Sequence, residues 1–270
     1  MTIPRITPIA LGLLAVVGCT PDAPMPARAP DRITQVSVIN ALMVGRYDGV
    51  MPMSEFLRLG DFGVGTLDHL DGELTVLDGL AFQVRGDGSV HPVGDDRSVP
   101  FASITPFDSD GEFPLSAVGS LEDLDARLGA ALPQKNSFVA IRVDGRFSSI
   151  TLRSVHRQEP PYRPLGEVAK TQSMWTREDL AGTLVGIRSP AWVGGINVPG
   201  YHWHFLSDDR KVGGHVLDCR AGAVRVRYDV CQEWMVKLDG TPGADQADLA
   251  QDTSKDLRRV ESSRGDDRER

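Results

Sequence analysis

Positive charge, cysteine and long apolar runs are all scarce in this 270-residue sequence. Its 29 lysines and arginines are outnumbered by 37 acidic residues, and the net charge of -8 argues against nucleic acid as a partner. The apolar run at residues 9–17 is too short to span a bilayer as a stable anchor. The sequence shows no repeat, no long charged block and no thiamine or pyridoxal signature. What remains is a globular composition, with enough residues for a sizeable core in one large or two small domains.

Residues 1–19 have the features of a lipoprotein-type signal peptide. Arg5 supplies a positive charge before the apolar run, and Val16-Val17-Gly18-Cys19 resembles a bacterial lipobox, in which Cys19 receives the lipid. Residues 20–32 are rich in proline and alanine, which is typical of a flexible tether. We therefore expect an exported bacterial protein, periplasmic or anchored to a membrane through Cys19. The alternative is plain signal cleavage near an incidental cysteine.

The three cysteines allow one internal disulfide at most if Cys19 carries a lipid. Cys219 and Cys231 then remain, and an oxidising periplasm would permit a bridge between them. The sequence leaves their redox state open.

Most segments after residue 33 have the composition of short strands separated by turn residues. Asp78-Gly79 is a strong hairpin-turn dipeptide, and Asp144-Gly145 is predicted to form a similar turn between strands at 138–143 and 147–152. Ser120 is predicted to cap an amphipathic helix at 121–128, and Thr176 a short helix at 177–181.

This pattern predicts an α+β fold made of two β-sheet-based subdomains with few short helices. The proline-rich stretch near residues 158–165 suggests a crossover, which places an N-terminal β-rich subdomain at 33–160 and a C-terminal one at 161–264. Residues 265–270 form a polar extension. A predicted β-hairpin of the C-terminal subdomain carries three histidines, which form a candidate metal site.

Three histidines in the C-terminal third carry the strongest chemical signal. His202 and His204 are two residues apart, so on a β-strand both rings point to the same face. His215 follows a polar stretch whose midpoint, Asp209-Arg210, suits a turn, and an antiparallel hairpin places His204 opposite His215. Three imidazoles converging on one face form a metal site with open positions, as a catalytic zinc requires.

Glu73, Arg153 and Glu261 have no comparable local signal. From spacing alone, Glu73 is a solvated carboxylate at a strand edge and Arg153 is a surface charge at a strand end. Glu261 falls in a tail that its composition predicts to be disordered.

Short motifs follow one another along the chain, and between them they contain the three histidines, Glu73, Arg153 and Glu261. They are Gly60-Asp-Phe-Gly-Val-Gly-Thr66, Leu70-Asp-Gly-Glu73, Arg153-Ser154, Tyr201-His-Trp-His204, Gly213-Gly-His215 and Glu261-Ser-Ser-Arg264. With these motifs in this order, the sequence resembles the bacterial α-acetolactate decarboxylase family from about residue 35 to residue 264, nearly the whole mature chain.

The resemblance implies a complete active site. Its parts are the zinc ligands His202, His204 and His215, the catalytic residues Glu73, Arg153 and Glu261, and the substrate-binding residues Thr66 and Arg153. The implied reaction converts 2-acetolactate to acetoin and CO2 through a metal-chelated enediolate that a glutamate protonates. Glu73 is favoured as this acid/base, Glu261 stays open between zinc ligand and proton donor, and the family suggests a homodimer.

Two alternatives come from other classes of protein. Cupin-like metal oxygenases or isomerases also use His-x-His and a later histidine on β-strands, but the positions of their usual glutamate hold Asp208 and Asp209 here. A periplasmic lipoprotein that binds zinc or carbohydrate without catalysis would need no Glu73 or Arg153 at an open metal position.

Overall fold

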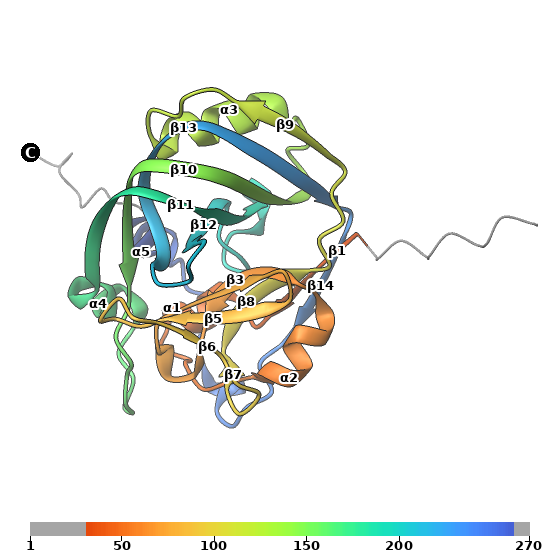
Figure 1. Cartoon of the computed structure of the whole chain (residues 1–270). Helices are drawn as coiled ribbons and strands as arrows, with labels where there is room; N and C mark the ends of the chain where they lie inside the picture. The colour runs from red at the N-terminus through yellow and green to blue at the C-terminus, as the bar shows by residue number, and fades with distance from the viewer. Residues whose placement is uncertain (1–30, 262–270) are drawn as a thin grey trace, which may run out of the picture.

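Two large β-sheets with short helices around them dominate the structure, a computed structural model that describes residues 31–261 (Figure 1). This confirms the predicted β-rich α+β fold with few short helices. The predicted signal peptide, Cys19, all but the end of the tether and the polar extension at 265–270 lie outside the described residues. Within residues 31–261, no helix is long and apolar enough to cross a membrane.

The first sheet has seven strands in the order β14-β1-β8-β3-β4-β5-β6. They are β1 (Arg32–Val36), β3 (Phe62–Thr66), β4 (Glu73–Leu77), β5 (Leu80–Val84), β6 (Val90–Pro92), β8 (Phe101–Thr105) and β14 (Glu233–Lys237). Asp78 and Gly79, with φ angles of 53° and 76°, form the predicted hairpin turn between β4 and β5. Two short strands, β2 (Met51–Pro52) and β7 (Ser98–Val99), pair separately.

The second sheet has longer strands in the order β10-β11-β12-β13-β9. They are β9 (Gly111–Leu115), β10 (Phe138–Ser154), β11 (Ser173–Ser189), β12 (Gly200–Ser207) and β13 (Gly213–Cys231). Because β10 pairs with β13 as well as with β11, this sheet closes on itself. In Figure 1 its curved strands form the upper half of the molecule, above the first sheet.

The predicted turn at Asp144-Gly145 is wrong, because both residues lie inside the single strand β10. The Asp144 carboxylate accepts hydrogen bonds from Arg142 on its own strand, Thr183 on β11 and Arg227 on β13. These three donors satisfy the Asp144 carboxylate within the sheet. The acidic residue that suggested a turn is therefore bound by neighbouring strands.

The predicted helix at 177–181 is also wrong, since these residues and Thr176 belong to β11. They pair with β10, where Ile150 lies opposite Arg177 and Phe147 opposite Leu180. Main-chain pairing along β10 overrides the weak local preference for a helix.

The predicted subdomain boundary at 160/161 does not coincide with the division between the sheets. β9 and β10 precede residue 160 but belong to the second sheet, while β14 follows it and forms an edge of the first. The reason is pairing between segments far apart in sequence: β10 joins β11 and β13, and β14 runs parallel to β1.

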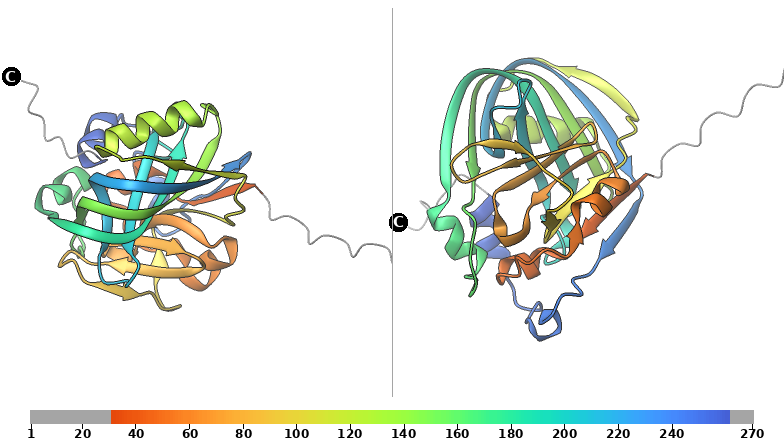
Figure 2. Two further views of the ribbon diagram at one scale, coloured as in Figure 1. Left: turned by 45° about the horizontal axis from the view of Figure 1, so that its top comes forward. Right: turned by 60° about the horizontal axis from the view of Figure 1, so that its bottom comes forward.

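One buried cluster joins the two sheets. Val64 and Phe82 of the first sheet share it with Ala140, Ile187 and Leu206 of the second. Figure 2 shows the sheets stacked, with α3 lying across the second sheet in its left view. The shared cluster makes the two sheets a single packed body.

The helices lie around this body. They are α1 (Ile39–Met43), α2 (Met53–Phe56), α3 (Leu121–Ala131), α4 (Leu165–Val168) and α5 (Ser254–Glu261). α3 confirms the helix predicted after Ser120, whose hydroxyl accepts a hydrogen bond from the Asp123 N–H at 3.1 Å. α1, α4 and α5 share a buried cluster that includes Leu42, Leu165 and Val260. The last described helix is therefore packed against segments from much earlier in the chain.

Cys219 and Cys231 are both buried free thiols. Both lie on β13, where Cys219 is opposite Ile150 and Cys231 is opposite Phe138 near the other end of β10. The register therefore keeps the two sulfurs too far apart for a disulfide between Cys219 and Cys231, which the sequence had left open.

Candidate metal centre

The hairpin of β12 and β13 brings the three histidines together. His204 lies directly opposite His215, as predicted, and His202 is two residues away on the same face of β12. One ligand atom from each of the three rings lies within 4.8 Å of the others. The register thus places three imidazoles where a single ion could reach them all.

The histidine nitrogens have the hydrogen-bonding pattern of metal ligands. Nδ1 of His204 donates to the carbonyl oxygen of Leu74 at 2.9 Å, which fixes the tautomer and leaves the lone pair on Nε2. That Nε2 is buried and has no hydrogen-bond partner among residues 31–261. A buried polar atom without a partner costs free energy, so this nitrogen fits a bound metal ion.

Burial also keeps these rings neutral. It lowers the pKa of His202 and lowers the pKa of His204 and His215 well below the usual value. The nearby Arg153 guanidinium adds to this lowering in all three rings. A neutral imidazole has the free lone pair that a metal ion needs.

Glu73, Arg153 and Glu261 converge on the same point. Arg153 donates through one terminal nitrogen to Glu73 at 3.1 Å and through the other to Glu261 at 3.5 Å. Glu73 and Arg153 are only 6% and 4% exposed, so the expectations of a solvated carboxylate and a surface charge are wrong. Glu261 lies in α5, not in a disordered tail.

The carboxylates face the histidine nitrogens. Oε2 of Glu73 is 3.5 Å from Nε2 of His204. Oε2 of Glu261 is 3.7 Å from Nε2 of His215 and 4.0 Å from Nε2 of His202. The residues that the sequence resemblance brought together are therefore neighbours in space.

Strand pairing explains this convergence. Arg153 lies opposite His215 in the β10–β13 pair, and Thr66 lies opposite Glu73 in the β3–β4 pair. Each cross-strand pair holds its side chains about 5 Å apart on one face. The site is thus built where the second sheet faces β4 of the first.

Glu73 is a carboxyl group with unusual proton affinity. Burial raises its pKa to about 7, the Arg153 guanidinium opposes this rise, and the negative charge of Glu261 adds to it. In the metal-free protein, Glu73 therefore holds a proton for part of the time at neutral pH.

A small cavity of about 40 Å³ lies beside these groups. Thr66, Glu73, Arg153, His202 and Glu261 supply its polar side. The rest of its lining is apolar, from Ile39, Leu42, Leu70, Phe101, Val155, Leu165, Val198 and Val260. Sequence patterns did not predict this apolar wall, because its members come from separate elements. Only Leu70, Val155 and Val260 lie in or next to a motif of the family resemblance.

Thr66 occupies the cavity wall but uses its hydroxyl elsewhere. The hydroxyl donates to the carbonyl oxygen of Gly72 at 2.6 Å. Thr66 therefore ties down the residue just before Glu73, while direct substrate binding by Thr66 stays a prediction.

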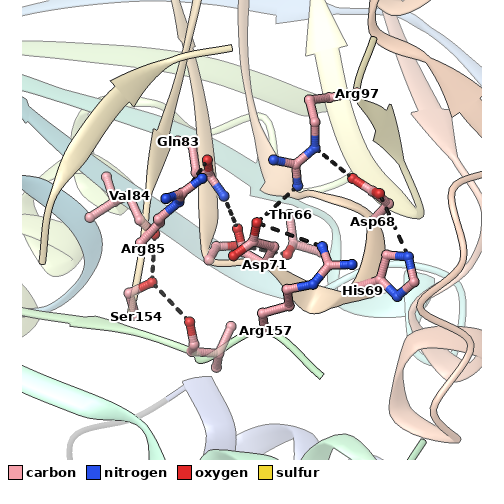
Figure 3. A network of polar contacts seen from close by, with 12 residues as sticks. Thr66, Asp68, His69, Asp71, Gln83, Val84, Arg85, Arg97, Ser154 and Arg157 are labelled. Atoms are coloured by element: carbon pink, nitrogen blue, oxygen red, sulfur yellow. Dashed lines mark hydrogen bonds and ion pairs between the residues drawn. The ribbon is translucent and has the colours of Figure 1, made fainter. Parts of the chain in front are cut away.

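The turn between β3 and β4 is held by a polar network (Figure 3). Arg97 donates to Asp68 at 2.9 Å and to Asp71 at 3.1 Å, and Gln83 donates to the Asp71 carbonyl oxygen at 2.6 Å. Within this turn, His69 and Leu70 adopt positive φ angles of 61° and 51°, a conformation that side chains disfavour. The network holds the strained turn that leads directly into Glu73.

We expect Gly72→Ala to lower the free energy of unfolding by about 2–4 kcal/mol, because the new Cβ would be strained as well as crowded. Gly72 has φ +83°, and a Cβ there would lie 2.1 Å from the Val84 carbonyl oxygen. Urea denaturation measures the change. Gly222→Ala, where a Cβ meets nothing within 4 Å, is the control, and equal stability of both variants would contradict the prediction.

Comparison with known proteins gives one consistent result. The sequence pattern of the family described as alpha-acetolactate decarboxylase matches residues 33–251. The alpha-acetolactate decarboxylase of Methanosarcina mazei is 42% identical over 233 residues, which cover 86% of this chain and 81% of that protein. The Bacillus subtilis protein of the same name is 38% identical over 233 residues, which cover 86% of this chain and 91% of that protein. The crystal structure of alpha-acetolactate decarboxylase from Bacillus subtilis strain 168 matches with a TM-score of 0.83 at 37% identity, covering 86% of this chain and 100% of that chain.

Proposed function

Since the chain belongs to the alpha-acetolactate decarboxylase family, we propose that it converts 2-acetolactate to acetoin and CO2 at the three-histidine centre. The observation that carries this proposal is the placement of Glu73, Arg153 and Glu261 against His204 and its two partners, beside a cavity. A metal-binding protein without catalysis would have no use for a buried acid and a buried guanidinium there.

We propose zinc as the ion, held by His202, His204 and His215. Imidazole nitrogens with nearby carboxylates are a donor set that zinc prefers. When bound, a divalent ion supplies Lewis acidity that stabilises negative charge on substrate oxygens. Three neutral imidazoles leave the charge of the ion undiminished.

Arg153 orients the substrate in this proposal. Its guanidinium is buried, and Nε has no hydrogen-bond partner among the described residues. Guanidinium donors match carboxylate and enediolate oxygens in a two-pronged contact. A fixed carboxylate decides which carbon–carbon bond breaks.

Glu73 delivers the proton. Loss of CO2 leaves an electron pair on C2, which the neighbouring C3 ketone accepts as an enediolate. Glu73 comes from the rigid strand β4, and the proton that it donates to carbon completes acetoin. Glu261 either binds the ion or shares this proton transfer. Its Oε2 lies 4.0 Å from Nε2 of His202 and 3.7 Å from Nε2 of His215, beside the histidine centre.

We also propose that the mature chain is exported and anchored through lipid on Cys19, and that it forms a homodimer. The lipobox-like residues Val16-Val17-Gly18-Cys19 support the anchor, and the sequence resemblance supports the dimer. Mass spectrometry of the membrane fraction tests the first proposal, and light scattering of the purified chain tests the second.

The test of function is an assay on the purified mature chain, stripped of metal and then resupplied with zinc. We expect equimolar acetoin and CO2 from 2-acetolactate only after zinc is added. Zinc binding without turnover would favour the non-catalytic lipoprotein, and oxygen uptake with iron would favour the cupin-like enzyme.

We expect Arg153→Ala to reduce kcat by about 10²–10³, the usual effect of removing one donor that stabilises developing negative charge. Steady-state kinetics and metal content are measured together. Arg146→Ala is the control, because Arg146 lies on the same strand but is paired with Asp179 at the surface. Wild-type turnover in Arg153→Ala would remove this residue from the mechanism.

A further inference from the structure

The proposed reaction has a proton requirement that its cavity does not explain. The 2-acetolactate anion and one proton give acetoin and CO2, so each turnover takes one proton from solvent. The small cavity beside Glu73 has a mostly apolar lining. A separate polar path from solvent would replace the proton that the substrate carbon receives.

A second cavity, of about 450 Å³, lies between α3 and strands β12 and β13. We call it the α3 cavity. Its wall includes Glu122, Asp125, Tyr201, Asp218, His215 and Glu261. A cavity of this size with several polar groups has room for a chain of hydrogen-bonded waters.

The two cavities meet at Glu261, which lines both of them. Its Oε1 faces Arg153 in the inner cavity. Its Oε2 is buried without a hydrogen-bond partner among the described residues. The α3 cavity thus reaches the edge of the reaction site from a side different from the apolar wall.

Asp125 is the acidic group of this cavity with the most unusual setting. The indole N–H of Trp203 donates to its Oδ1 at 2.8 Å, and Trp203 lies between His202 and His204 on β12. Burial raises the pKa of Asp125 to about 7, and the Trp203 hydrogen bond opposes this rise. Charged or titratable groups face it from each packed element: Glu122 on α3, Tyr201 on β12 with Arg188 of β11 behind it, and Asp218 and Cys219 on β13.

We propose that the α3 cavity is the entry path for the proton consumed in each turnover, with Asp125 as the proton-relay residue on its wall. This inference rests on the proposed function. Asp125 takes a proton from bulk water and passes it to cavity water, which carries it to Glu261. From there the proton crosses the inner cavity, which both carboxylates line, and replaces the proton that Glu73 has given to carbon. The path needs no co-reactant other than water. Asp125 touches neither substrate nor metal.

The test compares wild type with Asp125→Asn, which keeps an oxygen to accept the Trp203 hydrogen bond but cannot carry a proton. In dilute buffer we expect kcat to fall at least about tenfold, with KM and metal content unchanged. Imidazole or another small buffer acid should restore kcat in a saturable way, and the solvent deuterium isotope effect should rise. Asp125→Ser gives a second background for rescue if the Asn variant folds poorly.

Asp123→Asn is the matched control, because Asp123 lies on the same helix and is bonded to the Gly119 N–H instead of lining the cavity. We expect its kcat to be independent of buffer. Buffer-independent wild-type turnover in the Asp125 variants, or a loss that no buffer acid restores, would overturn the relay. A wild-type chain that makes no acetoin would instead refute the proposed function, and the relay with it.

Discussion

Glu73→Gln is expected to lower kcat by about 10²–10⁴, the range that general acid–base groups contribute. Glutamine has nearly the same shape, and its Oε1 can still accept the hydrogen bond that Arg153 now gives Glu73 at 3.1 Å. What the variant loses is the proton that the substrate carbon receives. Acetoin formation and CO2 release are measured separately, because the variant could still release CO2 while failing to protonate the carbon that becomes acetoin.

The loss should not come from unfolding. The folded-state pKa of Glu73 is raised from 4.5 to about 7, so the ionised carboxylate costs stability once the pH exceeds its unfolded value. In metal-free protein, this cost grows as the pH rises to about 7, to at most about 3 kcal/mol. Glu73→Gln should therefore melt at the same temperature as wild type near pH 4 and higher near pH 8.

Glu112→Gln is the control for this substitution. Glu112 lies on β9 and is paired with Arg225 at the surface. The variant therefore removes a carboxylate from an arginine pair, as Glu73→Gln does, but away from the site. Wild-type turnover of a metal-loaded Glu73→Gln enzyme would show that another group delivers the proton.

His204→Ala is expected to abolish turnover, because it removes the most buried of the three histidines. The Leu74 carbonyl oxygen accepts the hydrogen bond from its Nδ1, which leaves Nε2 free to bind the ion. With two of three histidines left, we expect metal affinity to fall at least about 100-fold. Metal analysis after dialysis against a weak chelator measures the loss.

His91→Ala is the matched control, since His91 also lies on a strand but is exposed, and its ring forms a hydrogen bond with the Ser89 hydroxyl. It should keep wild-type metal content and activity. One zinc per chain in dialysed His204→Ala would contradict the assignment of the metal centre.

The histidine centre could be predicted from the sequence because it is local. His202, His204 and His215 lie within one hairpin, and strand periodicity with a turn midpoint was enough to set their register. Arg153 and Glu261 reach the same point from elements far away in sequence, and no spacing rule links them. Only the family resemblance placed them together.

The errors in the predicted fold have the same origin. Asp144-Gly145 has the composition of a turn, and residues 177–181 have that of a helix start. Both are strands because β10 pairs along its length with β11 and β13. Local composition does not report pairing between distant segments, and the same limit hid the apolar wall around Leu70 and Val198.

The position of Glu261 on α5 sets an order of assembly. A ribosome has produced every histidine, Glu73 and Arg153 before it adds this carboxylate. We therefore expect a chain cut before Glu261, through incomplete synthesis or proteolysis, to keep all three histidines but to lack one wall of the reaction site. Such a chain should still bind the ion and yet convert no substrate.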